Sequence, residues 1–261
     1  MAQLSFTLFF GVLVATLALT NATDYCSPSL CKEGVNHIAC GHDGELSDAC
    51  PSDAKLIEID DKLQEVLVNA HNAKRNLIAG GDQEEHDPAC RMATIQWDDE
   101  LALLAALNVL QCDIKHDRCR NTDAFKYSGQ NIAWLGYHGA SNDEALLQKA
   151  VDYWYSEVKD SKMEYINKYP KNYTGPVIGH FTVMVADRNV RVGCAAATYS
   201  VPDEAYKAYL VTCNYATTNM IDFPIYNRCD KPAESCATGT NPSYPNLCST
   251  SEEYAVNEFK H

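Results

Sequence analysis

Positive charge is scarce in this chain. Lys and Arg together number 21 against 35 Asp and Glu, which gives a formal net charge of −14 and a sequence pI near 4.9. Nucleic-acid binding driven by electrostatic attraction is therefore not expected, because it depends on cationic side chains that neutralise phosphates. General adhesion to anionic membranes or heparin is disfavoured for the same reason, unless the fold gathers a local basic patch. The charge favours small molecules, cations or particular proteins as partners.

Long apolar runs are missing after residue 22. No later segment holds 18 uninterrupted apolar residues, so we expect no transmembrane helix. Residues 1–22 carry no charged side chain, and their apolar run at 8–19 is too short to span a bilayer. Small and polar residues follow that run at a plausible cleavage point. We therefore expect residues 1–22 to be a secretory signal peptide and the mature protein to be extracellular.

Motifs of hydrolases and zinc sites are also absent. The chain has no G-x-S-x-G, no H-E-x-x-H and no RGD tripeptide. His116 stands between Cys112 and Cys119, but this spacing is not the C-x2-C of structural zinc sites, so metal is not expected there. No motif fixes a nucleophile or a set of oxyanion donors either. Catalysis is therefore the less favoured interpretation.

Cysteine, in contrast, is abundant. The chain has 12 cysteines, all after residue 22. An even number in a secreted chain predicts up to six disulfides and argues against reactive thiols. Most of them lie in glycine- and proline-containing segments near the two ends, which predicts cross-linked extensions around a central domain.

Helical periodicity dominates the first half of the chain. Apolar residues recur every three or four positions in 57–79, and a glycine pair ends that stretch. A second helix is predicted over 97–112 with Asp98 as its cap. A third is predicted from Ser141, which opens a capping-box sequence, to about residue 159.

Strand-forming residues dominate from residue 175 onward. The segments 180–186, 190–199 and 206–215 are rich in Val, Thr, Tyr and Phe and are separated by turn-like sequences. If the last two pair as antiparallel strands, Cys194 and Cys213 can bridge them. Helices followed by strands predict an α+β fold.

Ordered motifs give the chain a family resemblance. GHFTVMVADRNVRVGC at 179–194 and YLVTCNYATTNM at 209–220 are similar to two signatures of the CAP superfamily, which groups cysteine-rich secretory, antigen 5 and pathogenesis-related proteins. AHNAKRN, WDDELA, GQNIA and WYSEV match further motifs of that family. The four N-terminal cysteines and QCDIKHDRC resemble the insect antigen 5 branch, and the C-terminal cysteines resemble its fly members.

The resemblance implies the fold and the domain boundaries. It implies a three-layer α-β-α sandwich over residues 57–220, with a cysteine-rich extension at 23–56 and a cysteine-containing tail at 221–261. It also implies four disulfides, which pair Cys26 with Cys40, Cys31 with Cys119, Cys50 with Cys112 and Cys194 with Cys213. For the four remaining cysteines we expect the pairs Cys236 with Cys248 and Cys90 with Cys229.

The resemblance further implies a polar cluster in a central cleft. Matched motif by motif, its members are His71, Gln130, Glu157 and His180, where Gln130 stands at a position that is commonly Glu. Two imidazoles and a carboxylate can bind Zn²⁺ or Cu²⁺. We expect weak, exchangeable metal binding through His71, His180 and Glu157, with no cofactor required. The alternative is that the cluster is a structural hydrogen-bond network.

Three functions follow as hypotheses. The first is an extracellular, monomeric binding or effector protein, of the salivary or venom allergen type, that takes a metal, an amine, a lipid or another small hydrophobic ligand. The second is a metal-dependent redox or hydrolytic enzyme, and the third is a rigid scaffold recognised by a host or receptor protein. An aromatic-rich neighbourhood could line a ligand groove or belong to the core; its residues are Tyr153, Trp154, Tyr155, Tyr165 and Tyr169. Asn172 begins an N-glycosylation sequon in a loop.

Overall fold

A central β-sheet organises the protein. The computed structural model describes residues 23–259, so the predicted signal peptide lies outside the described residues. The strand order is β1-β4-β5-β3 with antiparallel neighbours, and β2 pairs in parallel with the start of β4. The strands are β1 (Lys55–Ile57), β2 (Gln96–Trp97), β3 (Gly129–Tyr137), β4 (Arg191–Ser200) and β5 (Lys207–Tyr215).

Both faces of this sheet are buried. Successive side chains of a strand point to opposite faces, and along β4 Cys194 and Ala196 join one core cluster while Ala195 and Ala197 join another. Strands covered on both faces are apolar throughout rather than alternating. This explains why β4 and β5 read as continuous apolar runs in the sequence.

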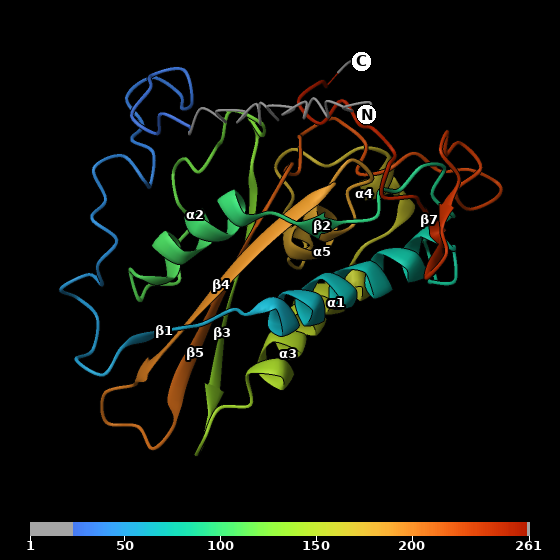
Figure 1. Cartoon of the computed structure of the whole chain (residues 1–261). Helices are drawn as coiled ribbons and strands as arrows, with labels where there is room; N and C mark the ends of the chain where they lie inside the picture. Colours follow the sequence, from blue (N-terminus) through green and yellow to red (C-terminus); the bar gives the residue numbers. More distant parts are fainter. Residues whose placement is uncertain (1–22, 260–261) are drawn as a thin grey trace, which may run out of the picture.

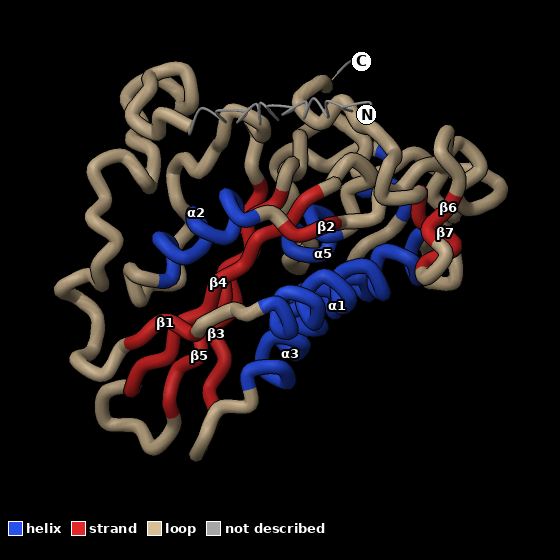
Figure 2. Tube along the Cα trace, viewed as in Figure 1, coloured by secondary structure: helices blue, strands red, loops and turns tan. Residues whose placement is uncertain are grey.

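Helices form the two outer layers. α1 (Asp61–Ala79) and α3 (Asp143–Tyr155) pack against each other on one face, and α2 (Asp99–Val109) covers the other (Figures 1 and 2). The shorter helices η1 (Ser156–Asp160), α4 (Met163–Asn167) and α5 (Gly179–Met184) complete the α3 side. The predicted α-β-α sandwich is therefore confirmed.

The helix caps explain where the long helices begin. Asp60, Asp98 and Asn142 each accept a hydrogen bond from a backbone N–H in the first turn. The cap of the third helix is thus Asn142 and not Ser141, because it is the Asn142 side chain that reaches the N–H of Ala145.

α2 lies unusually close to β4. A Cβ placed on Gly193 would lie 2.1 Å from the backbone nitrogen of Ala102 and 2.4 Å from the carbonyl oxygen of Asp98. Only glycine allows this approach. The close approach places the start of α2 directly against the sheet, and with it the loop that follows this helix.

Two elements of the structure differ from the sequence prediction. Residues 180–186 were predicted as a strand, but Gly179–Met184 form α5. The backbone N–H groups of His180 and Phe181 donate to the Glu157 carboxylate, so a tertiary contact stabilises a helical turn in a segment of strand-forming residues. β3 was not predicted as a strand at all.

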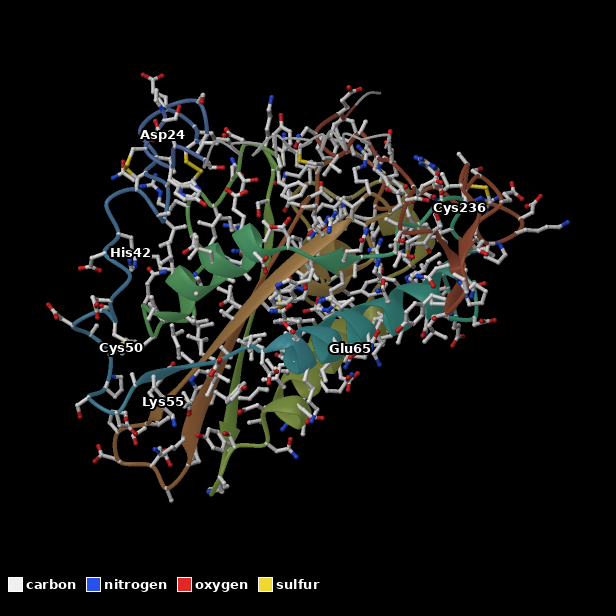
Figure 3. The ribbon with its side chains drawn as sticks, viewed as in Figure 1. Asp24, His42, Cys50, Lys55, Glu65 and Cys236 are labelled. Carbon is white, nitrogen blue, oxygen red and sulfur yellow. A yellow bond between two sulfur atoms is a disulfide. The ribbon has the colours of Figure 1, made fainter. Side chains whose placement is uncertain are left out.

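Disulfides fasten both extensions, and all six predicted pairs are present. No cysteine is free in the part of the chain that the structure describes. Tyr25, Ile38 and Leu46 of the N-terminal extension pack on the outer face of α2. The C-terminal tail holds a small sheet of β6 (Thr240–Asn241) and β7 (Tyr244–Cys248). The part of the tail around Cys236 lies far from Asp24 of the N-terminal extension (Figure 3).

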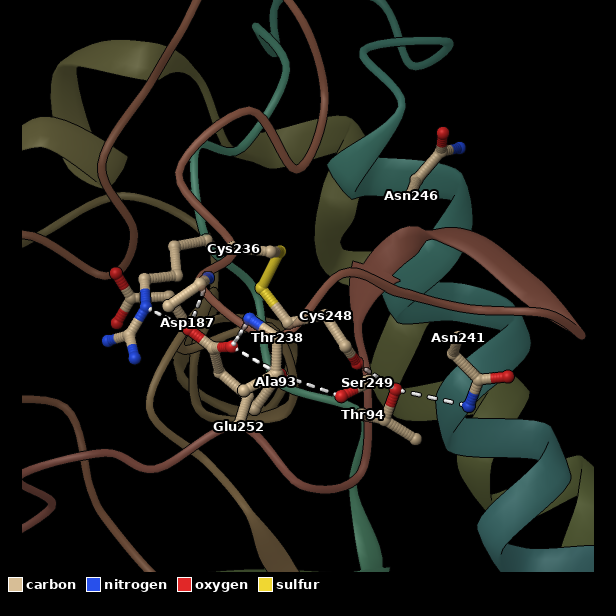
Figure 4. Close-up of a disulfide and its surroundings, with 12 residues drawn as sticks. Ala93, Thr94, Asp187, Cys236, Thr238, Asn241, Asn246, Cys248, Ser249 and Glu252 are labelled. Atoms are coloured by element: carbon tan, nitrogen blue, oxygen red, sulfur yellow. Dashed lines mark hydrogen bonds and ion pairs between the residues drawn. A yellow bond between two sulfur atoms is a disulfide. The ribbon is translucent and has the colours of Figure 1, made fainter.

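A buried carboxylate joins the tail to the domain. Next to the Cys236–Cys248 disulfide, Glu252 accepts hydrogen bonds from the backbone and hydroxyl of Thr238 and from Nε of Arg91 (Figure 4). Although burial opposes its ionisation, these donors lower the pKa of Glu252 to about 2. The tail is therefore an integral part of the folded unit. Across residues 23–259, no helix combines the length and apolarity that crossing a membrane requires.

Candidate functional site

A histidine and a glutamate form the first half of the candidate site. Glu157 of η1 accepts a 2.5 Å hydrogen bond from Nδ1 of His180, the second residue of α5. Its other oxygen accepts from the backbone nitrogens of His180 and Phe181, at 2.9 and 3.1 Å. The carboxylate thus caps α5 and orients the imidazole in one arrangement. Side-chain exposures of 25% for His180 and 13% for Glu157 leave the histidine the more accessible of the two.

Gln130 on β3 organises the second half. Its Oε1 accepts from Nδ1 of His116 at 2.9 Å and from the backbone nitrogen of Asp117 at 3.2 Å. Its Nε2 donates to the Asp117 carboxylate at 2.7 Å and to the Asn214 side chain at 3.0 Å. The amide is fully used as donor and acceptor. A carboxylate at this position would face the Asp117 carboxylate, so the glutamine fits its surroundings in this chain.

These contacts fix the tautomers of both histidines. An amide carbonyl and a carboxylate are acceptors, so Nδ1 of His116 and Nδ1 of His180 each carry the hydrogen. In the neutral rings the Nε2 lone pairs are then free, and neither Nε2 has a hydrogen-bond partner among residues 23–259. Although His116 has an exposed edge, the protein around it desolvates the ring and lowers its pKa, and the charges of Arg120 and His180 add to the lowering. The neutral, ligand-competent form of His116 is therefore favoured.

His71 does not join this cluster, which corrects the predicted site. It is fully buried on α1, where its Nδ1 donates to the Leu67 carbonyl oxygen at 2.7 Å and its Nε2 accepts from the Tyr215 hydroxyl at 2.9 Å. Burial lowers its pKa to about 4. With both ring nitrogens used, His71 cannot serve as a metal ligand. Asn131 extends this hydrogen-bond network. It donates to the Tyr215 hydroxyl and to the carbonyl oxygen of His180, and so links His71 to the site.

Sequence reasoning missed His116 and Asp117 as members of the site. The available signal was QCDIKHDRC, which places a histidine in a loop fixed by cysteines at both ends. The zinc arrangement considered for that loop does not exist, because Cys112 and Cys119 are both in disulfides.

Few side chains remain as candidate metal ligands. No group of three or more His, Cys, Asp or Glu is placed to hold a metal ion within residues 23–259. His116 and His180 nevertheless offer imidazole nitrogens, the ligands that suit Zn²⁺ and Cu²⁺, and each is held from behind by an oxygen acceptor. A site of this composition fits a metal whose remaining positions are filled by water.

The aromatic residues considered for a ligand groove do not share one face. Trp154 is fully buried, Tyr155 is 7% exposed, and Tyr153 is 60% exposed. Trp154 donates through Nε1 to the Ile132 carbonyl oxygen in the core. Tyr165 instead packs its ring on Tyr173. These positions match core and surface roles better than a single groove.

Comparisons with known proteins agree with this architecture. Residues 68–215 match the family model described as CAP, cysteine-rich secretory protein family. The chain belongs to the CAP family. The matched segment contains every residue of the site, His116, Asp117, Gln130, Glu157 and His180, as well as His71.

Several similar sequences come from insects. Venom allergen-1 of Aedes albopictus is 40% identical over 232 residues, which cover 88% of this chain and 88% of that protein. Antigen 5 like allergen Cul n 1 of Culicoides nubeculosus is 38% identical over 72% of this chain and 90% of its own. The chain is therefore of the venom allergen and antigen 5 type, as the resemblance implied.

A solved CAP structure supports the fold independently. The crystal structure of NaASP2 with Zn²⁺ matches with a TM-score of 0.62 at 22% identity, over 77% of this chain and 100% of that one. At that identity the likeness bears on the fold alone.

Proposed function

We propose that this CAP protein acts outside the cell as a binding or effector protein, and that it binds a divalent transition metal ion through Nε2 of His116 and Nε2 of His180. The observation that carries the proposal is the fixed tautomer of both rings, which leaves each Nε2 lone pair without a hydrogen-bond partner among residues 23–259. The two rings are near enough for the charge of His180 to contribute to lowering the pKa of His116. Six disulfides with no free cysteine in residues 23–259 favour an oxidising, extracellular environment. NaASP2 was crystallised with Zn²⁺, which makes Zn²⁺ the first ion to test.

The geometry favours binding over turnover. Glu157 already accepts three hydrogen bonds that orient His180 and cap α5, so proton transfer to this carboxylate would disturb the contacts that build the site. With two protein ligands and water in the other positions, we expect exchangeable rather than permanent metal. Asn172 is exposed in the loop before α5, where we propose a surface glycan.

Native mass spectrometry tests the proposal. The full chain secreted from insect cells, stripped with EDTA and supplied with Zn²⁺ or Cu²⁺, should gain the mass of one ion. His116→Ala/His180→Ala should not, whereas His138→Ala, which changes an exposed histidine outside the site, should bind like the unaltered protein. Equal uptake by the double variant, or no uptake by any protein, would overturn the proposal. Circular dichroism of each variant checks that the fold is retained.

A further inference from the structure

A second groove lies between the N-terminal extension and the segment that leads into β3. Its volume is about 320 Å³, and it is lined by Lys32 and Val35 of the extension, by residues 118–121 and 126–128, and by Thr218. A neighbouring hollow of about 510 Å³ shares Lys32 and Lys126 with it. In Figure 1 the blue extension approaches the loop that enters β3 at this place.

The groove gathers positive charge on an acidic protein. Lys32, Arg118, Arg120 and Lys126 line it, and no carboxylate side chain does; Asp123 lines only the neighbouring hollow. Within residues 23–259 none of these four cations forms an ion pair. The net charge of −14 makes this concentration a local exception. Cations that line one concave surface focus a positive potential into it.

Arg120 is held in the groove with part of its hydrogen-bonding capacity unused. Its Nη1 donates to the Asp117 carbonyl oxygen at 2.6 Å. Its Nε is buried and has no hydrogen-bond partner among residues 23–259. A buried donor with no hydrogen-bond partner is costly, and a planar guanidinium is the side chain best suited to oxyanions. An anion in the groove would offset part of that cost.

The walls of the groove are fixed to each other. The Cys31–Cys119 disulfide joins the extension to the domain, and Nδ2 of Asn121 donates to the Leu30 carbonyl oxygen at 2.7 Å. The backbone nitrogen of Ile38 donates to the Cys119 carbonyl oxygen at 3.0 Å. Walls that are already ordered reduce the entropy lost when a ligand binds. The cations are thus held together by cross-links and not only by flexible side chains.

We propose that this groove binds an oxyanion group, a sulfate or phosphate ester, carried by a small extracellular molecule. The four cations supply charge-assisted hydrogen bonds to the anionic oxygens. A volume of about 320 Å³ suits a ligand of one or two sugar-sized units rather than a long polymer. The groove lies next to the histidine site, because Arg120 donates to the Asp117 carbonyl oxygen, but its lining includes none of the residues of that site. Anion binding in the groove needs no metal.

Isothermal titration calorimetry of the full chain tests this proposal, with EDTA present to exclude metal. The probes are pyrophosphate and a sulfated heparin disaccharide. Both should bind, and the affinity should fall as salt increases. Lys32→Ala/Lys126→Ala should weaken binding by about tenfold or more, because two charge-assisted contacts are lost. Lys149→Ala/Lys159→Ala removes the same charge from exposed positions elsewhere and should have little effect.

The outcomes separate the sources of the anion. Binding of both probes supports an oxyanion site of broad specificity, and binding of only one supports a site selective for that anion, the phosphate of pyrophosphate or the sulfate of the disaccharide. No binding of either probe, or equal losses in the groove and control variants, overturns the proposal. His116→Ala/His180→Ala should bind the anion normally, so failure of the metal site and failure of this groove are distinguishable.

Discussion

Two histidine environments in this protein differ in what the second ring nitrogen does. His71 uses both nitrogens inside the core, between the Leu67 carbonyl oxygen and the Tyr215 hydroxyl. His180 uses only Nδ1, on the Glu157 carboxylate, and its Nε2 has no hydrogen-bond partner among residues 23–259. The first environment stabilises the neutral ring as part of the fold, whereas the second presents a lone pair to a ligand. A histidine is a candidate ligand only where one nitrogen is held and the other is free.

We expect the largest effect from acidification, which should destabilise the protein through the buried His71. The buried His71 has its pKa lowered to about 4, so below the ordinary value of about 6.5 the unfolded chain binds a proton that the folded chain does not. Titration of His71 therefore leaves the free energy of unfolding unchanged above about pH 6.5 and lowers it by ~3 kcal/mol as the pH falls to about 4. Urea unfolding across this range measures the decline.

His71→Gln should remove that part of the pH dependence, and His138→Gln, at an exposed site, should keep it. If His71→Gln loses stability on acidification with the same slope as the unaltered protein, His71 does not titrate as a buried neutral ring.

Loss of the carboxylate behind His180 should have the next largest effect. Glu157→Gln keeps the size of the side chain but weakens the acceptor that orients Nδ1 and caps α5. Removal of such a supporting partner typically costs about 10- to 100-fold in metal affinity. Zn²⁺ titration by calorimetry measures it, with Glu204→Gln as an exposed control. Unchanged affinity would mean that Glu157 does not position the ligand.

Gln130→Glu should give the smallest effect. The new carboxylate would lie where Nε2 donates to Asp117 at 2.7 Å, so the two acids would share a proton or repel. The pKa of the pair would rise in the folded state, and stability would be lost as the pH rises through that pKa. We expect about 1 kcal/mol of destabilisation at pH 7, recovered on acidification.

Gln148→Glu is the matched control for this change, because Gln148 also donates to an aspartate, Asp152, but at an exposed position. Equal pH-dependent losses in the two variants would show that burial of Gln130 contributes nothing.

The fold was more predictable than the site for physical reasons. Strong periodicity identified α1 and α2, and the apolar runs of β4 and β5 identified the central strand pair. α5 was missed because its sequence favours a strand and its helical turn depends on Glu157, which is distant in sequence. The site was hard to predict for the same reason, because its hydrogen bonds join residues that are distant in sequence. His71 and His116 both lie beside plausible motifs, and only the packing shows which of them has a free nitrogen.

The most direct test is a crystal of the full mature chain soaked with Zn²⁺ and measured at the zinc absorption edge. The account predicts one anomalous peak bonded to Nε2 of His116 and to Nε2 of His180, with no peak at His71 and with both Nδ1 contacts retained. A peak at any other set of residues, or no peak at His116 and His180, would contradict the assignment of these two histidines as a metal-binding pair.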